Sequence, residues 1–135
     1  MTDKFFLRIC AVYLLLYVGS FLIVVVNSLL NEALFPVDSV IGSVLARYPY
    51  AFDFEAMFAV LFFVWAVYLW RAADDIKQNS LFISFSGWAL LTHGFVFVGL
   101  ALFTGQDVWH FLRDSAHMIF FGIAQLYILR RHLHG

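Results

Sequence analysis

Hydrophobic positions along the chain form four apolar runs that are separated by short polar stretches. Two of the runs, residues 9–30 and 81–104, carry no charged residue, and His93 is the only histidine within them. A helix needs about 20 apolar residues to cross the hydrocarbon core, because its backbone hydrogen bonds must all be satisfied inside the segment. These two runs therefore predict membrane-crossing helices.

The other two runs, residues 56–70 and 115–129, are shorter, at about 15 residues each, and cannot cross unaided. Each is closed at its C-terminal end by arginine, so its missing turns must extend backwards into polar sequence. We therefore predict an all-α, antiparallel up-down bundle of four transmembrane helices that forms a single membrane domain. The expected helices cover about residues 7–30, 49–70, 80–104 and 108–131, with a connecting outer segment at 31–48.

The distribution of basic residues predicts the orientation of this bundle. Six of them flank one side of the predicted helices: Lys4, Arg8, Arg71, Lys77, Arg130 and Arg131. Only Arg47 and Arg113 fall on the other side. Because cytoplasmic loops are enriched in Lys and Arg, both termini are expected on the cytoplasmic side. Gly105 permits a tight reversal, which makes the third and fourth helices antiparallel neighbours.

Composition agrees with a membrane location and excludes other classes. The 135 residues are 64% hydrophobic and 13% charged, whereas soluble domains are about half apolar and a quarter charged. A formal net charge of −1 gives no basic excess for binding nucleic acid. Cys10 is the only cysteine, so an intrachain disulfide is impossible and a packing role is expected.

Ionisable residues on three predicted helices fall at similar depths. Counting ~1.5 Å per residue from the cytoplasmic ends places Glu55 and Asp114 near ~24 Å, and His93 and His117 near ~18–20 Å. His110, Asp114 and His117 follow i, i+4, i+7 spacing and share one helix face. Exposure of that face to lipid is costly, so we expect it to turn inwards, towards Glu55 and His93.

Several chemistries fit these residues. Imidazole and carboxylate ligands suit a divalent metal, for which the candidate ligands are Glu55, His93, His110, Asp114 and His117. His93 and His117 also have the depth expected of haem b ligands, a less favoured interpretation. A small organic or lipid ligand is a further interpretation, with Glu55, His93 and the deep Trp88 as binding residues. The structural alternative is a hydrogen-bonded network that only fixes helix packing.

Residues 50–129 resemble an uncharacterised family, known as a domain of unknown function, of small four-helix bacterial membrane proteins. The similarity is carried by Phe54-Glu55-Ala56-Met57, by the segment from Ser80 to Trp88, by His93, and by His110-Phe111-Leu112-Arg113-Asp114. The chain is also distantly similar to DoxX-like four-helix proteins. This resemblance implies a four-helix fold, a bacterial inner-membrane location and a site at Glu55, His93, His110 and Asp114, but no reaction. His117 lies outside the family pattern, which weakens the haem interpretation.

The sequence thus predicts a membrane protein with a polar pocket in the outer half of the bundle. No enzyme motif is evident, and a binding function is expected for a metal ion or a small ligand. The alternative is a non-catalytic accessory subunit, or a homo-oligomer, whose polar cluster is structural. Gly87, Gly94, Gly99 and Gly122 are expected to permit close helix approach rather than to mark a site.

Overall fold

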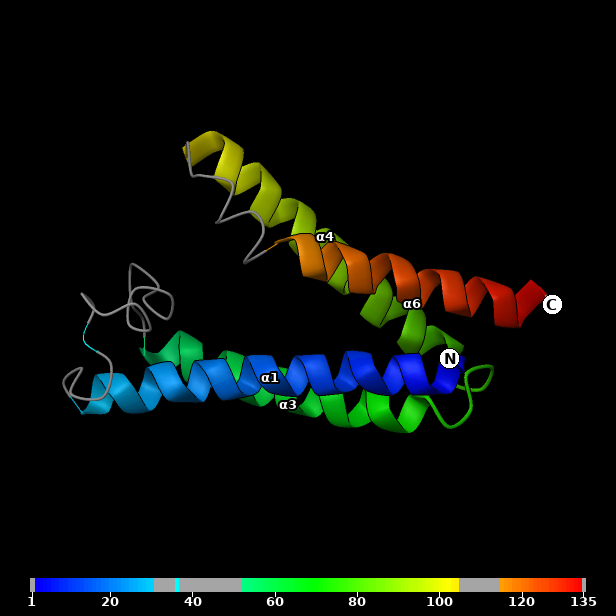
Figure 1. Ribbon diagram of the computed structural model, residues 1–135, viewed down its shortest axis with the longest axis horizontal. Helices are drawn as coiled ribbons and strands as arrows, with labels where there is room; N and C mark the ends of the chain where they lie inside the picture. The colour runs from blue at the N-terminus through cyan, green and yellow to red at the C-terminus, as the bar shows by residue number, and fades with distance from the viewer. Residues whose placement is uncertain (1, 31–35, 37–51, 105–114, 135) are drawn as a thin grey trace. The chain divides into compact units, whose positions relative to one another are not determined.

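The computed structural model describes residues 2–30, 36, 52–104 and 115–134, although the side chains of residues 52–55, 104 and 134 fall outside the description. These residues form four helices and no strand (Figure 1). The helices are α1 (Asp3–Leu29), α3 (Phe52–Ala72), α4 (Ser80–Thr104) and α6 (His117–His134). The all-α prediction is therefore confirmed for the described part of the chain. Residues 31–35, 37–48 and 108–114, which belong to the predicted outer segment and the start of the fourth helix, lie outside it.

Two of the described helices are long and apolar enough to span a membrane, namely Asp3–Leu29 and Ser80–Phe103. They cover all but the last residue of the two long apolar runs, 9–30 and 81–104, from which crossing helices were predicted. The apolar part of α3, Ala56–Ala72, is shorter, as expected from its 15-residue run.

Local polar contacts fix where helices begin and end. The Thr2 hydroxyl accepts a hydrogen bond from the Phe5 backbone N–H at 3.4 Å, which caps the start of α1. In the connection between α3 and α4, a carboxylate oxygen of Asp75 accepts from the Gln78 N–H at 3.0 Å, and the Asn79 side-chain amide donates to the Asp75 carbonyl at 2.8 Å. These contacts turn the chain over a few residues, after which α4 starts at Ser80.

The chain divides into two compact units. The first contains Met1–Cys10 and Leu69–Gly135, and the second contains Ala11–Tyr68. Helices α4 and α6 belong entirely to the first unit, whereas α1 and α3 contribute to both.

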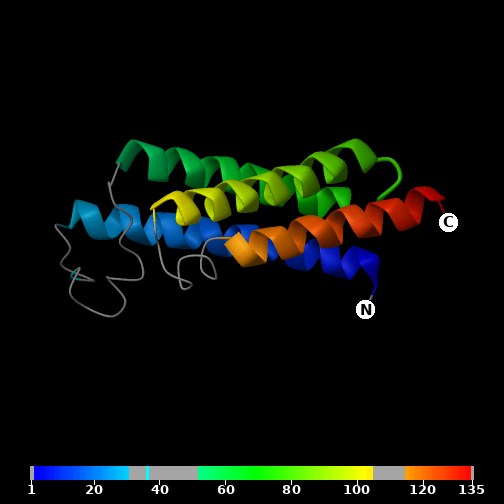
Figure 2. The same cartoon turned by 90° about the horizontal axis from the view of Figure 1, so that it is seen from above.

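In the first unit, α4 and α6 run antiparallel and side by side, as predicted (Figures 1 and 2). Glycines bring the two backbones together. A Cβ atom built on Gly122 would lie 2.8 Å from the Gly87 carbonyl oxygen and 2.8 Å from the Leu91 backbone nitrogen. A Cβ on Gly94 would lie 3.2 Å from the carbonyl oxygen of Ser115. The expected role in close helix approach is thus confirmed for these glycines, but Gly99 has nothing within 4 Å of its Cβ position.

In the second unit, α1 and α3 pack through aromatic rings. The rings of Tyr17 and Phe62 stack with centroids 5.8 Å apart, and those of Phe21 and Phe58 stack at 6.0 Å. Since residue numbers rise on α1 as they fall on α3, the two helices are antiparallel. Phe62 is the centre of this group, because it also contacts Phe21 and Trp65 and is only 4% exposed.

Large apolar side chains are exposed on all four helices. Examples are Leu16 on α1, Val60 on α3, Phe103 on α4 and Tyr127 on α6, which are between 64% and 92% exposed. In contrast, Cys10 is fully buried as a free thiol, which confirms its expected packing role.

Candidate functional site

Two residues predicted to bind a ligand, Trp88 and His93, line one open cavity of about 430 Å³. Both are on α4, in the first unit. The other described residues of the wall are also on α4: Phe85, Ala89, Thr92 and Val96. The structure therefore places these two residues on the wall of the same cavity.

The cavity lies on the face of α4 that is opposite the glycines. Phe85, Ala89, Thr92 and Val96 follow i, i+4, i+7, i+11 spacing, which keeps them on one side of a helix with 3.6 residues per turn. Gly87 and Gly94 face α6. Since α6 packs on the glycine face, it does not cover the cavity face of α4.

The cavity wall combines two aromatic rings, Phe85 and Trp88, with two polar side chains about one turn further along the helix, Thr92 and His93. Trp88 is 57% exposed and Phe85 61%, so both rings present apolar surface to an occupant. Thr92 and His93 are exposed beside them and supply a hydroxyl and an imidazole. The His93 ring meets the Phe97 ring edge to face, with 5.0 Å between centroids. Such a wall suits a largely apolar molecule with one or two hydrogen-bonding atoms.

The His93 side chain is exposed on α4 among the described residues. Depth along a helix gives a residue's level but not its direction, and the direction is set by which face of α4 packs on α6. The glycines occupy that packing face, so His93 is turned away from it.

The remaining predicted ligands are described only in part. Glu55 belongs to the first turn of α3, in the second unit, and its side chain falls outside the description. His117 is the first residue of α6 and is part-exposed. His110 and Asp114 lie outside the described residues. Among residues 2–30, 52–104 and 115–134, no group of three His, Cys, Asp or Glu side chains could hold a metal ion.

Sequence reasoning missed Phe85, Ala89, Thr92 and Val96 as members of the wall. These four residues could have been predicted from their helical spacing, because they lie on the face of the helix between Trp88 and His93. It also missed Gln125, a fully buried side chain on α6 near the Cys10 thiol. Neither amide atom of Gln125 makes a hydrogen bond of ordinary geometry with the described residues, and the Cys10 thiol is a polar group close to it. Gln125 could have been noticed in the sequence because its amide side chain lies inside the apolar run 115–129.

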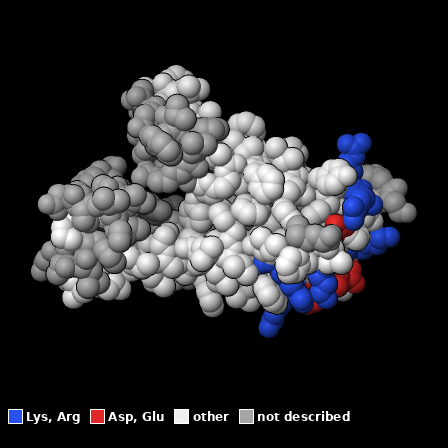
Figure 3. All heavy atoms as spheres, in the orientation of Figure 1, with Lys and Arg blue, Asp and Glu red and all other residues white. Residues whose placement is uncertain are grey.

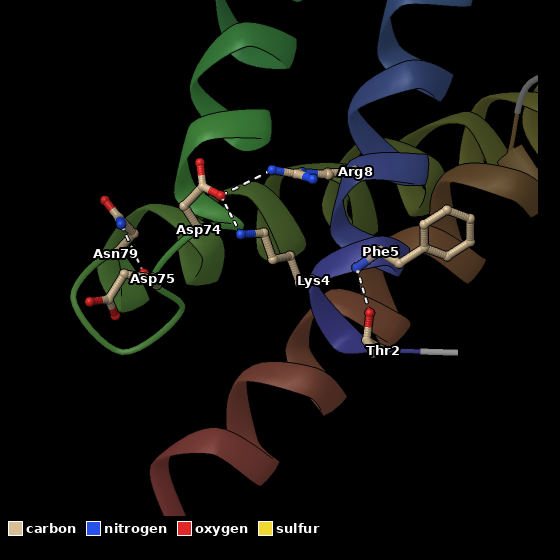
Figure 4. A network of polar contacts seen from close by, with 7 residues as sticks. All are labelled: Thr2, Lys4, Phe5, Arg8, Asp74, Asp75 and Asn79. Carbon is tan, nitrogen blue, oxygen red and sulfur yellow. Dashed lines mark hydrogen bonds and ion pairs between the residues drawn. The ribbon is translucent and has the colours of Figure 1, made fainter.

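A second polar feature occupies one end of the first unit, where Lys and Arg gather (Figure 3). Asp74 pairs there with Lys4 at 2.5 Å and with Arg8 at 3.0 Å (Figure 4). The Arg8 guanidinium also lies 4.9 Å from the centre of the Trp70 ring, a cation–π contact. These contacts join the start of α1 to the end of α3.

Asp3 makes the corresponding link between the start of α1 and the end of α6. Its carboxylate binds the Arg131 guanidinium, and it lies 2.9 Å from His132 Nε2. The basic end of α6 is therefore paired in part with an acidic residue from α1.

Electrostatics at Asp74 follow from these neighbours. The hydrogen bond from Lys4 lowers the pKa of the Asp74 carboxyl below its ordinary value, and the charges of Lys4 and Arg8 act in the same direction. Asp74 thus stays ionised, and able to hold both cations, at pH values where an isolated carboxyl is already partly protonated.

No protein-family model, curated protein or solved structure matches this chain. The similarity to the uncharacterised four-helix family therefore stays an expectation carried by the residues quoted for it.

Proposed function

We propose that this chain is a four-pass integral membrane protein that binds a small, largely apolar ligand at the α4 cavity. The observation that carries the proposal is the joint presence of Trp88, Thr92 and His93 on one open, otherwise apolar cavity wall. In this proposal both chain ends are cytoplasmic and the protein resides in the inner membrane of a bacterium.

The membrane location is supported by where apolar and charged side chains lie. Two helices have the length and apolarity for crossing, and all four helices expose large apolar side chains. Lys and Arg gather at one end of the first unit, as they do at a cytoplasmic boundary. Lipid tails are the solvent that such a surface requires.

Fusion reporters test the four crossings directly. Green fluorescent protein fused after residue 78 or at the C-terminus is expected to fluoresce. Alkaline phosphatase is expected to be active when fused after residue 106 and inactive at the other two positions. Alkaline phosphatase activity at residue 78 would overturn the proposed orientation.

The ligand is argued from the chemistry of the cavity wall. No carboxylate, lysine or arginine is among the described lining residues, so an ionic ligand is not favoured there. The indole and phenyl rings offer flat apolar contact, and each ring is worth about 0.5–1.5 kcal/mol beyond its area when paired with another aromatic group. His93 and Thr92 would hydrogen-bond a hydroxyl or carbonyl group of the ligand. Keeping these two polar side chains inside the bilayer costs little free energy only when such a partner is present.

Extraction of ligand from purified protein tests this site. Protein isolated in mild detergent would be extracted with organic solvent and the extract analysed by mass spectrometry. A molecule enriched over bulk lipid is expected with the wild-type chain and should be depleted about fivefold by His93→Leu, since a lost hydrogen bond is worth ~1 kcal/mol. Trp88→Leu should deplete it as well.

Phe95→Leu is the matched control, because Phe95 is 58% exposed on the same helix but does not line the cavity. Identical extracts from the wild type, Trp88→Leu and His93→Leu would remove the site. The predicted metal centre is the competing outcome. It would appear as stoichiometric zinc, iron or manganese that is lost in Glu55→Gln and His93→Ala.

An accessory role in a larger membrane complex is the second candidate, favoured by the large apolar side chains exposed on every helix. Migration in mild detergent as a species larger than the chain and its micelle, with a stoichiometric second protein, would support it. A lone monomer or homo-oligomer would count against it.

A further inference from the structure

We infer that the charged end of the first unit is a binding surface for anionic phospholipid headgroups. This surface is defined by its nine charged residues: Asp3, Lys4, Arg8, Arg71, Asp74, Asp75, Lys77, Arg130 and Arg131. The inference rests on the proposed membrane location, but it does not depend on the α4 cavity or its ligand.

Charge at this surface is opposite in sign to the charge of the chain. The nine residues comprise six basic and three acidic side chains, a formal balance of +3. The whole chain carries −1, so the other charged residues, all between positions 32 and 114, sum to −4. A slightly acidic protein therefore has one basic end, and the partner that complements this end is anionic.

Pairing within the surface leaves specific cations available. Asp74 is shared by Lys4 and Arg8, and Asp3 is used by Arg131. Arg71, Lys77 and Arg130 are exposed and form no ion pair with any residue in the described part of the chain. Two of these three are arginines, whose planar guanidinium binds phosphate oxygens in a bidentate manner.

Apolar side chains next to these cations suit the membrane interface. Trp70 precedes Arg71 and is 42% exposed, and Leu133 follows the Arg130–Arg131 pair and is 53% exposed. Tryptophan is enriched at the level of lipid headgroups, where its ring is apolar and its N–H is polar. Basic residues beside such anchors are attracted to anionic leaflets by about 1 kcal/mol each, a factor of about five.

Lipid selectivity measured by electron paramagnetic resonance tests the inference. The full chain would be reconstituted in phosphatidylcholine vesicles with spin-labelled phosphatidylglycerol or spin-labelled phosphatidylcholine. The wild type is expected to prefer phosphatidylglycerol, and this preference should decline as salt is raised from 0.01 to 1 M, because salt screens exposed charges.

Three variants make the test specific to charge. Arg71→Gln with Arg130→Gln should reduce the preference by up to about 25-fold, towards none. Arg71→Lys with Arg130→Lys keeps the charge and should retain most of the preference. Asp75→Asn adds one net positive charge, keeps a side-chain oxygen that can accept from Gln78, and should strengthen the preference.

Equal affinity of the wild type for the two spin-labelled lipids at low salt would overturn the inference, as would a preference that the double glutamine variant retains. The inference would also be overturned if the wild type shows no preference for phosphatidylglycerol and instead co-purifies with an acidic protein segment that binds through Arg71 and Arg130. Vesicle flotation separates this from the wider proposal. A chain that floats with vesicles but shows no preference refutes the headgroup site alone, whereas one that fails to float refutes the membrane location as well.

Discussion

Gly122→Ala offers the sharpest test of how the first unit is held together. The new Cβ would stand 2.8 Å from two backbone atoms of α4, the Gly87 oxygen and the Leu91 nitrogen. Ordinary van der Waals contact begins at 3.4 Å, so α6 must move away by roughly 0.6 Å, the difference between the two distances. Neither backbone atom can move aside as the end of a flexible side chain can.

Magnitude follows from the comparison with Gly99→Ala. Both changes add one methyl group to a helix interior, and both gain up to ~1 kcal/mol of helix propensity. Gly99 has nothing within 4 Å of its Cβ position, so only Gly122→Ala incurs the overpacking cost of about 1–3 kcal/mol. Because the propensity terms cancel, Gly122→Ala should be about 1–3 kcal/mol less stable than Gly99→Ala.

Gly87→Ala provides an intermediate case. Its Cβ would meet the Leu126 side chain at 2.8 Å, which can rotate, and the Gly122 carbonyl oxygen at 3.2 Å. The expected order of stability is Gly99→Ala, then Gly87→Ala, then Gly122→Ala.

The assay is equilibrium unfolding in mixed micelles, with sodium dodecyl sulfate titrated against a mild detergent and helix content followed by circular dichroism. If Gly122→Ala and Gly99→Ala unfold at the same detergent fraction, the close α4–α6 backbone contact is wrong.

Three further changes test other contacts. Asp74→Asn should free Lys4 and Arg8 and speed amide hydrogen exchange at residues 73–79. Because the pKa of Asp74 is lowered, the ion pairs of the wild type should be intact at neutral pH and lost only as pH falls through that lowered pKa. Equal exchange rates in the wild type and the variant at pH 7 would contradict this role of Asp74. Gln125→Met, which removes an unpaired buried amide at similar volume, should leave stability unchanged or raise it by ~1 kcal/mol in the same unfolding titration, and a loss above that would reveal a missed partner. Phe62→Ala should destabilise the second unit by ~3–5 kcal/mol, and by the lower end of this range in the proposed membrane location, where lipid tails also solvate apolar surface. A change below ~1 kcal/mol would argue against the ring cluster.

Helices were the most predictable part of this molecule. Run length and the absence of charge identified α1 and α4, which are the two described helices long and apolar enough to span a membrane. The shorter α3 run was also visible, and its N-terminal extension takes in Asp53 and Glu55 as expected. The two short helices start in polar sequence, where hydropathy carries no boundary signal.

The candidate site was predictable only in part. Trp88 and His93 were selected by depth, and they share a cavity. The direction of His93 was not predictable, because it depends on which face of α4 packs against α6. That face is set by the positions of small residues, and single-sequence periodicity is weak in a helix that is apolar nearly all round. The convergence of Glu55, His110, Asp114 and His117 stays a prediction.

The contacts of Asp3 have a consequence for the order in which the chain can be assembled. Gly87 and Gly122 are joined by one helical hairpin, so this packing can form as soon as α6 leaves the ribosome. The pairing of Arg8 with Asp74 spans 66 residues and is available earlier, once α3 has been made. The Asp3–Arg131 contact spans 128 residues and must come last. Until then the Asp3 carboxylate lacks Arg131. A synthesis intermediate that stops before α6 therefore differs from the finished protein in having no Arg131 partner for Asp3.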